Sequence, residues 1–341
     1  MATLVHKDEG APALPPAGAG GARTPMRILI TGITGFVGGH LVDHLVSAGG
    51  HALFGVSRNA TWPPVLEHLA PHAKLFACDL CDRAGTEAVV REVRPDWVVH
   101  LAGYANTGGS FRDPDRAWRE NFTATRSLYD ALAASGVQSR VLFVSTGLIY
   151  GEPDRPDEPC DEFTTLKPAS PYAASKAAAD LISYQYTRSP GLDIVRVRLF
   201  NQIGPRQSAD FAVPNFARQI AAAEKGTQPP EVRTGDLSAR RDIADVRDIV
   251  AAFPLLLEKG VNGEAYNAAR GDSYQIQDVL DRLVAMARLP IKVVQTLEPG
   301  RKADTAVTSA DARKLRAATG WEPQIPLERT LADVLNYWRS I

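Results

Sequence analysis

Short apolar runs alternate along the first 200 residues with longer stretches in which apolar residues recur every three or four positions. Continuous apolar strands separated by amphipathic helices are typical of a parallel sheet that is buried on both faces. The pattern therefore predicts an α/β fold with a doubly wound parallel sheet. The expected strands are 28–31, 53–56, 75–78, 97–101, 141–144 and 194–199, and the expected helices are 37–47, 83–92, 114–134 and 171–187.

The alternation loosens after residue 200. Helical periodicity continues there, and short apolar runs lie between the helices. We expect this second half to form a smaller mixed α/β lobe over the carboxyl ends of the strands, where doubly wound sheets bind their ligands. Its expected helices are 210–225, 246–259, 276–287, 309–319 and 327–338.

The amino-acid composition limits which classes of protein this chain can belong to. The 341 residues are 45% apolar, which is typical of a globular protein, and no apolar segment is long enough to span a bilayer. The formal net charge is −1 with both signs interspersed, which does not favour a nucleic-acid or membrane partner. The first 25 residues are rich in Ala, Gly and Pro and lack the apolar core of a signal peptide, so we expect a disordered arm.

The three cysteines suggest a reducing, cytoplasmic location, since an odd and sparse count does not suit a disulfide framework. Cys78 and Cys81 form a CxxC pair, but the sequence shows no further pair at the spacing of a zinc site. We therefore expect no metal and interpret both as small residues at the end of a strand.

The segment 31–40, TGITGFVGGH, follows the first strand directly. Gly32, Gly35 and Gly38 permit a tight turn, close approach of a pyrophosphate to backbone amides, and packing of a helix on the sheet. Phe36 and Val37 would begin that helix. Glycine-rich turns are common, so a plain turn is the alternative. The strand before and the helix after favour a dinucleotide site, and thus a Rossmann-type domain.

The residues after the second strand bear on the choice of cofactor. A carboxylate there would bind the ribose hydroxyls and repel a 2′-phosphate, but the chain has Ser57 and Arg58. A hydroxyl and a guanidinium can both bind a phosphate, which favours NADP(H), with NAD(H) possible. The alternative is that Arg58 is a solvated charge or only stacks on adenine. Other strand ends expected to contact the cofactor contribute Asp79, Leu80, Leu101, Ala102 and Gly103.

Tyr172 and Lys176 lie four residues apart, so they share one face of the expected helix. A nearby ammonium should lower the pKa of the phenol and make it useful for proton transfer. Thr146, at the end of the fifth strand, could hold a substrate oxygen beside the phenol. The alternatives are a surface tyrosine with a solvated lysine, and a threonine that only caps a turn.

These segments, together with STGLIYG at 145–151 and YAASK at 172–176, resemble the extended short-chain dehydrogenase/reductases that act on nucleotide sugars. The resemblance runs from about residue 26 to the end. It implies a homodimer formed through 114–134 and 171–187. It also implies roles for particular residues: Thr146, Tyr172 and Lys176 in catalysis; Asn121 and Leu199 beside the cofactor; Asn201, Arg241 and Arg301 on the sugar diphosphate; and Arg218 on the substrate.

The resemblance also bears on the reaction. Dehydratases of this family carry an acidic residue where this chain has Leu148, which disfavours a 4,6-dehydratase. The segments NQIGPRQ and TGDLSARRDIADVRD resemble GDP-4-keto-6-deoxy-D-mannose reductases, which form GDP-D-rhamnose, although those often have an acidic residue in the STGLIYG-like segment. The resulting prediction is reduction of the C4 carbonyl of a nucleotide-linked 4-keto-6-deoxy sugar. The alternatives are a 4-epimerase with tightly bound NAD and a non-enzymatic NADP(H) sensor.

The predicted organisation is an arm at 1–25, an NAD(P)-binding Rossmann domain at 26–200, and a mainly substrate-binding lobe at 201–341. Part of that lobe is expected to return to the first domain.

Overall fold

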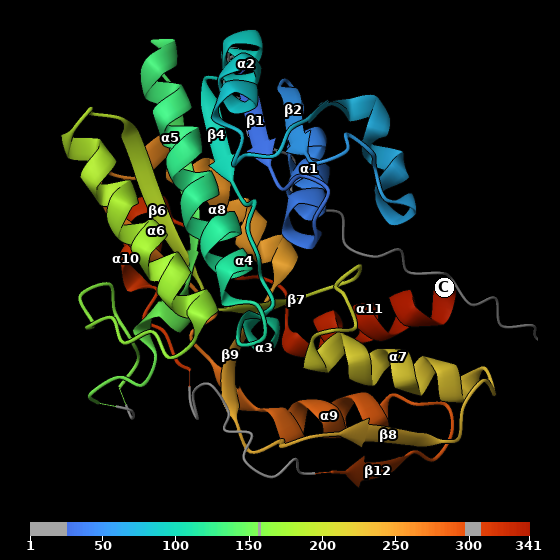
Figure 1. Ribbon diagram of the computed structural model, residues 1–341. Coiled ribbons are helices and arrows are strands. Elements are labelled where there is room, and N and C mark those ends of the chain that lie inside the picture. The colour runs from blue at the N-terminus through green and yellow to red at the C-terminus, as the bar shows by residue number, and fades with distance from the viewer. Residues whose placement is uncertain (1–25, 156–157, 297–307) are drawn as a thin grey trace, which may run out of the picture.

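A computed structural model describes residues 26–155, 158–296 and 308–341 (Figure 1). Its centre is a seven-stranded sheet in the order β10-β6-β5-β4-β1-β2-β3, with every neighbouring pair parallel. The order reverses between β1 and β4, which opens a crevice at the carboxyl ends of these strands. The strands are β1 (Arg27–Thr31), β2 (Ala52–Ser57), β3 (Ala73–Ala77), β4 (Trp97–His100), β5 (Arg140–Thr146), β6 (Asp193–Leu199) and β10 (Ala265–Ala268).

Helices cover both faces of this sheet, as the apolar strands predict. Side chains alternate between the two faces: Ile30 and Val99 belong to one core, Leu29 and Val98 to the other. The first core also includes residues of α1 (Phe36–Ala48), α8 (Val246–Lys259) and α10 (Arg313–Thr319), and the second includes residues of α2 (Arg83–Val93), α5 (Ala124–Ser135) and α6 (Pro171–Arg188).

A smaller group of elements lies beyond the carboxyl ends of the strands and has a core of its own (Figure 1). Phe216, Leu280 and Leu331 are buried there, one from each of three helices. Strand β7 leads from β6 into this part. The elements are α7 (Ala212–Glu224), α9 (Ile276–Ala285), α11 (Leu327–Ser340), the three-stranded sheet of β7 (Asn201–Ile203), β9 (Arg240–Asp245) and β11 (Ser273–Gln275), and the pair β8 (Glu231–Thr234) and β12 (Lys292–Gln295).

The structure departs from the sequence prediction in two helices. The expected helix 114–134 is divided into α4 (Pro114–Trp118), a π-helical turn (Arg119–Thr123) and α5. The expected helix 309–319 begins only at Arg313. Strand β10 comes late in the chain and joins the central sheet, so part of the second half returns to the first domain. Short helical turns also occur at Pro64–His72, Thr107–Ser110 (α3) and Gly147–Tyr150.

The arm expected at 1–25 lies outside the described residues. Among the helices that are described, none combines the length and apolarity needed to cross a membrane.

Candidate active site

A cleft of about 650 Å³ lies at the carboxyl ends of the central strands and extends to residues of the smaller lobe. It brings together nearly all the residues singled out from the sequence. Arg218 does not line it; this guanidinium donates to Asn215 Oδ1 at 3.0 Å. Arg301 lies outside the described residues. The predicted residues in the cleft are Gly32, Gly35, Phe36, Val37, Gly38, Ser57, Arg58, Asp79, Leu80, Leu101, Ala102, Gly103, Asn121, Thr146, Tyr172, Lys176, Leu199, Asn201 and Arg241.

The glycine turn after β1 is built as its spacing predicts. Gly32 has a φ of +71°, and a Cβ there would lie 2.8 Å from Ala102 N, so a side chain would be strained and would collide with the neighbouring strand end. A Cβ on Gly38 would lie 2.4 Å from Gly32 O. The turn delivers the N-terminus of α1 to the cleft, where its amide groups and helix dipole suit a pyrophosphate. The residues present therefore fit a dinucleotide.

The carboxyl end of β2 offers donors to a ribose phosphate. Ser57 Oγ is buried and has no hydrogen-bond partner within the described part of the chain. Arg58 follows it with a side chain that is 68% exposed. An orphaned hydroxyl next to an exposed guanidinium is a donor set that suits a phosphate.

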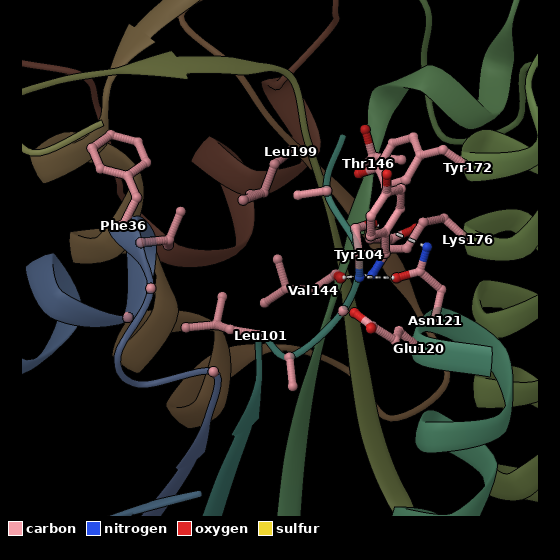
Figure 2. A pocket seen from close by; sticks show the side chains of 18 of the residues that line it. Phe36, Leu101, Tyr104, Glu120, Asn121, Val144, Thr146, Tyr172, Lys176 and Leu199 are labelled. Carbon is pink, nitrogen blue, oxygen red and sulfur yellow. Dashed lines mark hydrogen bonds between the residues drawn. The ribbon is translucent and has the colours of Figure 1, made fainter. Parts of the chain in front are cut away.

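Tyr172 is positioned by the start of α6. Ser170 caps this helix by accepting a hydrogen bond from Ala173 N at 3.1 Å, and Pro171 occupies the first helical position. Ser110 Oγ accepts a further bond from Tyr172 N at 3.1 Å. The Tyr172 ring consequently points into the cleft, on the side where Thr146 lies (Figure 2).

The electrostatics of Tyr172 differ from the expectation. Burial raises the pKa of this phenol, and the hydrogen bond with Thr146 opposes the rise only in part. The Lys176 ammonium instead donates to Val144 O at 2.6 Å (Figure 2) and lies 4.7 Å from the centre of the Phe143 ring. Burial lowers the pKa of Lys176 to about 8, against a raising effect of Asp180.

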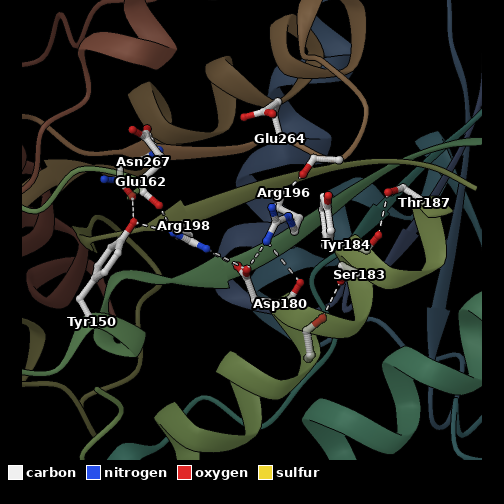
Figure 3. A network of polar contacts seen from close by, with 12 residues as sticks. Tyr150, Glu162, Asp180, Ser183, Tyr184, Thr187, Arg196, Arg198, Glu264 and Asn267 are labelled. Atoms are coloured by element: carbon white, nitrogen blue, oxygen red, sulfur yellow. Dashed lines mark hydrogen bonds and ion pairs between the residues drawn. The ribbon is translucent and has the colours of Figure 1, made fainter. Parts of the chain in front are cut away.

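Behind Lys176, a buried ion network ties α6 to the sheet (Figure 3). Asp180 accepts from Arg196 Nη1 at 2.6 Å and from Arg198 Nη2 at 3.0 Å, both on β6. Arg198 Nη1 also donates to Tyr150 Oη at 2.9 Å, and Tyr150 donates to Asn267 Oδ1 at 2.7 Å. The network connects α6 with β6, β10 and the segment after β5, so it fixes where the residues of α6 lie.

Asn121 lines the cleft, yet its side chain is fully engaged by protein. Its Oδ1 accepts from Tyr104 N at 2.8 Å, and its Nδ2 donates to Tyr104 O and to Ser175 Oγ. Ser175 Oγ in turn donates to Tyr172 O at 2.8 Å. Asn121 therefore joins the segment after β4 to the helix that carries Tyr172.

Several cleft residues were missed by the sequence interpretation. Glu120 stands next to a residue that was identified, and only its place in the π-helical turn brings it to the cleft. The other missed residues carry no local motif, because they meet at the cleft only through tertiary folding. They include Tyr104, Arg119, Gln207, Phe211 and Thr308.

Comparisons with known proteins place this geometry in a family. Residues 29–334 match the family described as GDP-mannose 4,6 dehydratase. The chain is 32% identical over 316 residues to GDP-6-deoxy-D-mannose reductase of Pseudomonas aeruginosa, covering 92% of this chain and 97% of that protein.

Two solved structures are similar along nearly their whole length. RMD from P. aeruginosa complexed with NADPH has a TM-score of 0.80 and 31% identity, covering 92% of this chain and 99% of that one. The UDP-glucose 4-epimerase of Thermus thermophilus in complex with NAD has a TM-score of 0.81, the same identity and the same coverage.

Proposed function

The chain belongs to the GDP-mannose 4,6 dehydratase family, within the extended short-chain dehydrogenase/reductases that act on nucleotide sugars, and we propose that it is an NADP(H)-preferring reductase. Its substrate would be a nucleotide-linked 4-keto-6-deoxy sugar, with GDP-4-keto-6-deoxy-D-mannose reduced to GDP-D-rhamnose as the first candidate. The observation that carries the proposal is the pair of hydroxyls on Tyr172 and Thr146, which meet beside Lys176 in a cleft suited to a dinucleotide.

The reduced nicotinamide supplies a hydride for the carbonyl carbon. The protein must then stabilise and protonate the carbonyl oxygen. Tyr172 suits this task because its raised pKa keeps the phenol protonated at neutral pH, ready to donate to the C4 oxygen. Thr146 holds the same oxygen by a second hydrogen bond. Lys176, mostly protonated at pH 7, supplies positive charge near the developing alkoxide.

The remaining cleft residues support the choice of substrate. We propose that residues 26–200 bind the cofactor and that 201–341 mainly bind the sugar nucleotide. Asn201 and Arg241 line the cleft from the second part and would bind the diphosphate, for which a guanidinium fork is suited. Leu148 also lines the cleft and carries no acid or base, which argues against loss of water from the sugar.

Tyr172→Phe provides the direct test. Removal of the proton donor should lower kcat for NADPH-dependent reduction of the keto sugar by about two to four decades, with the Kd of NADPH little changed. Tyr184→Phe, on the exposed side of the same helix, is the matched control and should retain full activity. Absorbance of NADPH at its nicotinamide band measures the rate. Full activity of Tyr172→Phe would refute the role of the phenol.

A 4-epimerase is the second candidate, because the similar T. thermophilus structure is an epimerase with NAD. An epimerase returns the hydride to the sugar and therefore needs a retained oxidised cofactor and no added reductant. Protein purified without added nucleotide should release little NAD(H) on denaturation if it is a reductase. Stoichiometric NAD(H) in the released fraction, with turnover in the absence of NADPH, would instead identify the epimerase.

We also propose that the protein acts in the cytoplasm as a homodimer. The resemblance implies pairing through the 114–134 and 171–187 segments, and Leu181, Tyr184 and Trp118 are exposed apolar side chains on these segments. Dimerisation would remove them from water.

A further inference from the structure

Three consecutive residues, Arg119, Glu120 and Asn121, all line the cofactor cleft. In a regular α-helix, consecutive side chains are about 100° apart, so three in a row cannot share one narrow face. The π-helical turn of Arg119–Thr123 interrupts the regular pattern at this point. Single π-turns within helices occur frequently at functional sites. The irregular turn thus allows three consecutive side chains to line one cleft.

Two of these residues form ion pairs with residues at neighbouring strand ends. Arg119 is the cation of its pair, and Glu120 is the anion of its pair. Arg119 pairs with Asp79, which follows β3. Glu120 Oε1 accepts from Arg58 Nη1, which follows β2, at 3.3 Å. The same Glu120 oxygen also accepts from Arg116 Nε at 2.9 Å, one turn earlier in the helix. Glu120 is therefore shared by two arginines, one from each side.

We propose that Glu120 sets cofactor selectivity by competing with a ribose 2′-phosphate for Arg58. The inference rests on the proposed use of Arg58 for NADP(H). A carboxylate near the ribose favours free hydroxyls and repels a phosphate. The end of β2, where that carboxylate stands in NAD-binding proteins, has none here, but the π-helical turn brings one to Arg58 from another element (Figure 2 shows Glu120 beside Asn121).

The charges explain how both cofactors could bind. With a 2′-hydroxyl, Arg58 keeps its ion pair with Glu120. With a 2′-phosphate, Arg58 turns to the phosphate, which is possible because its side chain is largely exposed and an exposed ion pair is weak. Glu120 is not left unpaired, since Arg116 still donates to it. A stronger Arg58–Glu120 pair then lowers the affinity for NADPH relative to NADH.

The test measures binding of NADPH and NADH to the purified full chain by titration calorimetry, without any sugar. Glu120→Gln removes the competing charge and keeps an oxygen for Arg116. We expect the Kd of NADPH to fall about two- to fivefold and the Kd of NADH to stay the same or rise. Glu92→Gln, which removes a carboxylate paired with Lys74 outside the cleft, is the matched control and should change neither Kd.

A double-mutant cycle with Arg58→Ala makes the outcome specific. Arg58→Ala alone should raise the Kd of NADPH about tenfold and leave NADH unchanged. In the Arg58→Ala protein, Glu120→Gln should change the Kd of NADPH much less than it does in the wild type. The proposal is overturned if Glu120→Gln weakens NADPH, shifts both cofactors equally, or acts as strongly without Arg58.

These readouts also separate the two proposals. If Arg58→Ala leaves NADPH binding intact, the assignment of the 2′-phosphate site fails and Glu120 falls with it. If Arg58→Ala weakens NADPH but Glu120→Gln has no effect, only the role of Glu120 is refuted. Because no sugar is present, a negative reductase assay would leave both results interpretable.

Discussion

Lys176 shows how burial and charge oppose each other at a single residue. Its ammonium is almost completely enclosed, which lowers its pKa to about 8, while Asp180 raises it. The Val144 carbonyl accepts a hydrogen bond from this ammonium. Lys176 is therefore a cation at neutral pH that loses its charge far earlier than an exposed lysine.

The pKa of Lys176 gives a pH prediction. Since catalysis is proposed to need the protonated form, kcat/KM for NADPH should fall as pH rises through about 8. The Tyr172 phenol has a raised pKa and so cannot cause a decline at this pH. Initial rates between about pH 6 and pH 10 measure the profile, because kcat/KM reports ionisations of the free enzyme. A constant kcat/KM up to pH 9 would contradict the assignment.

Because helical spacing and strand ends bring such residues together, the sequence could predict that Tyr172, Lys176 and Thr146 lie near one another, and all three line the cleft. It could not give their electrostatics. The expected lowering of the Tyr172 pKa by Lys176 was wrong for this structure, since burial of the phenol acts in the opposite direction. Burial depends on what packs over a residue, and that is decided by segments far away in the chain.

At the scale of an element, the first turn of α6 links stability to activity. Ser170→Ala removes the acceptor for Ala173 N and should lower the free energy of unfolding by about 1 kcal/mol. Because Tyr172 lies in this turn, kcat should fall as well, while the Kd of NADPH changes little. Ser170→Thr keeps a capping hydroxyl and should restore both. Urea unfolding and initial rates provide the measurements; equal behaviour of the Ala and Thr variants would show that the cap is unimportant.

The regular elements follow from local sequence, whereas the irregular one does not. Apolar periodicity located α6, α8 and α11 to within a few residues. The same periodicity predicted one helix over 114–134 and missed the π-helical turn. Residues of that turn contact distant parts of the chain, with Arg119 paired with Asp79 and Glu120 with Arg58. Contacts with residues far away in the chain cannot be predicted from a local sequence pattern.

For the whole molecule, the order of strands and helices predicted the doubly wound sheet, and the structure confirms it. What the sequence left open was how the second half is distributed. Strand β10 and helix α8 return to the central sheet, while α7, α9 and α11 surround a separate core. Strand β10 is only four residues long and carries no alternating pattern, so its place at the edge of the sheet is a tertiary result.

The exposed face of α6 gives a prediction about assembly. Leu181 is 58% exposed there, and α6 packs beside α4, which carries the exposed Trp118. If two copies pair through this face, Leu181→Asp would bury a carboxylate with no partner, at a cost of several kcal/mol. Light scattering after size-exclusion chromatography should then show twice the chain mass for the wild type and a single chain mass for the variant.

Val261→Asp is the matched control for that experiment. Val261 is 59% exposed, as apolar as Leu181, and lies after α8, outside the proposed interface. This variant should remain a dimer, which separates a specific interface from a general effect of surface charge. Because Tyr172 and Lys176 lie on the buried side of the same helix, a monomeric Leu181→Asp protein should still bind NADPH. If Leu181→Asp dimerised with an unchanged dissociation constant, the interface would have to lie on another surface.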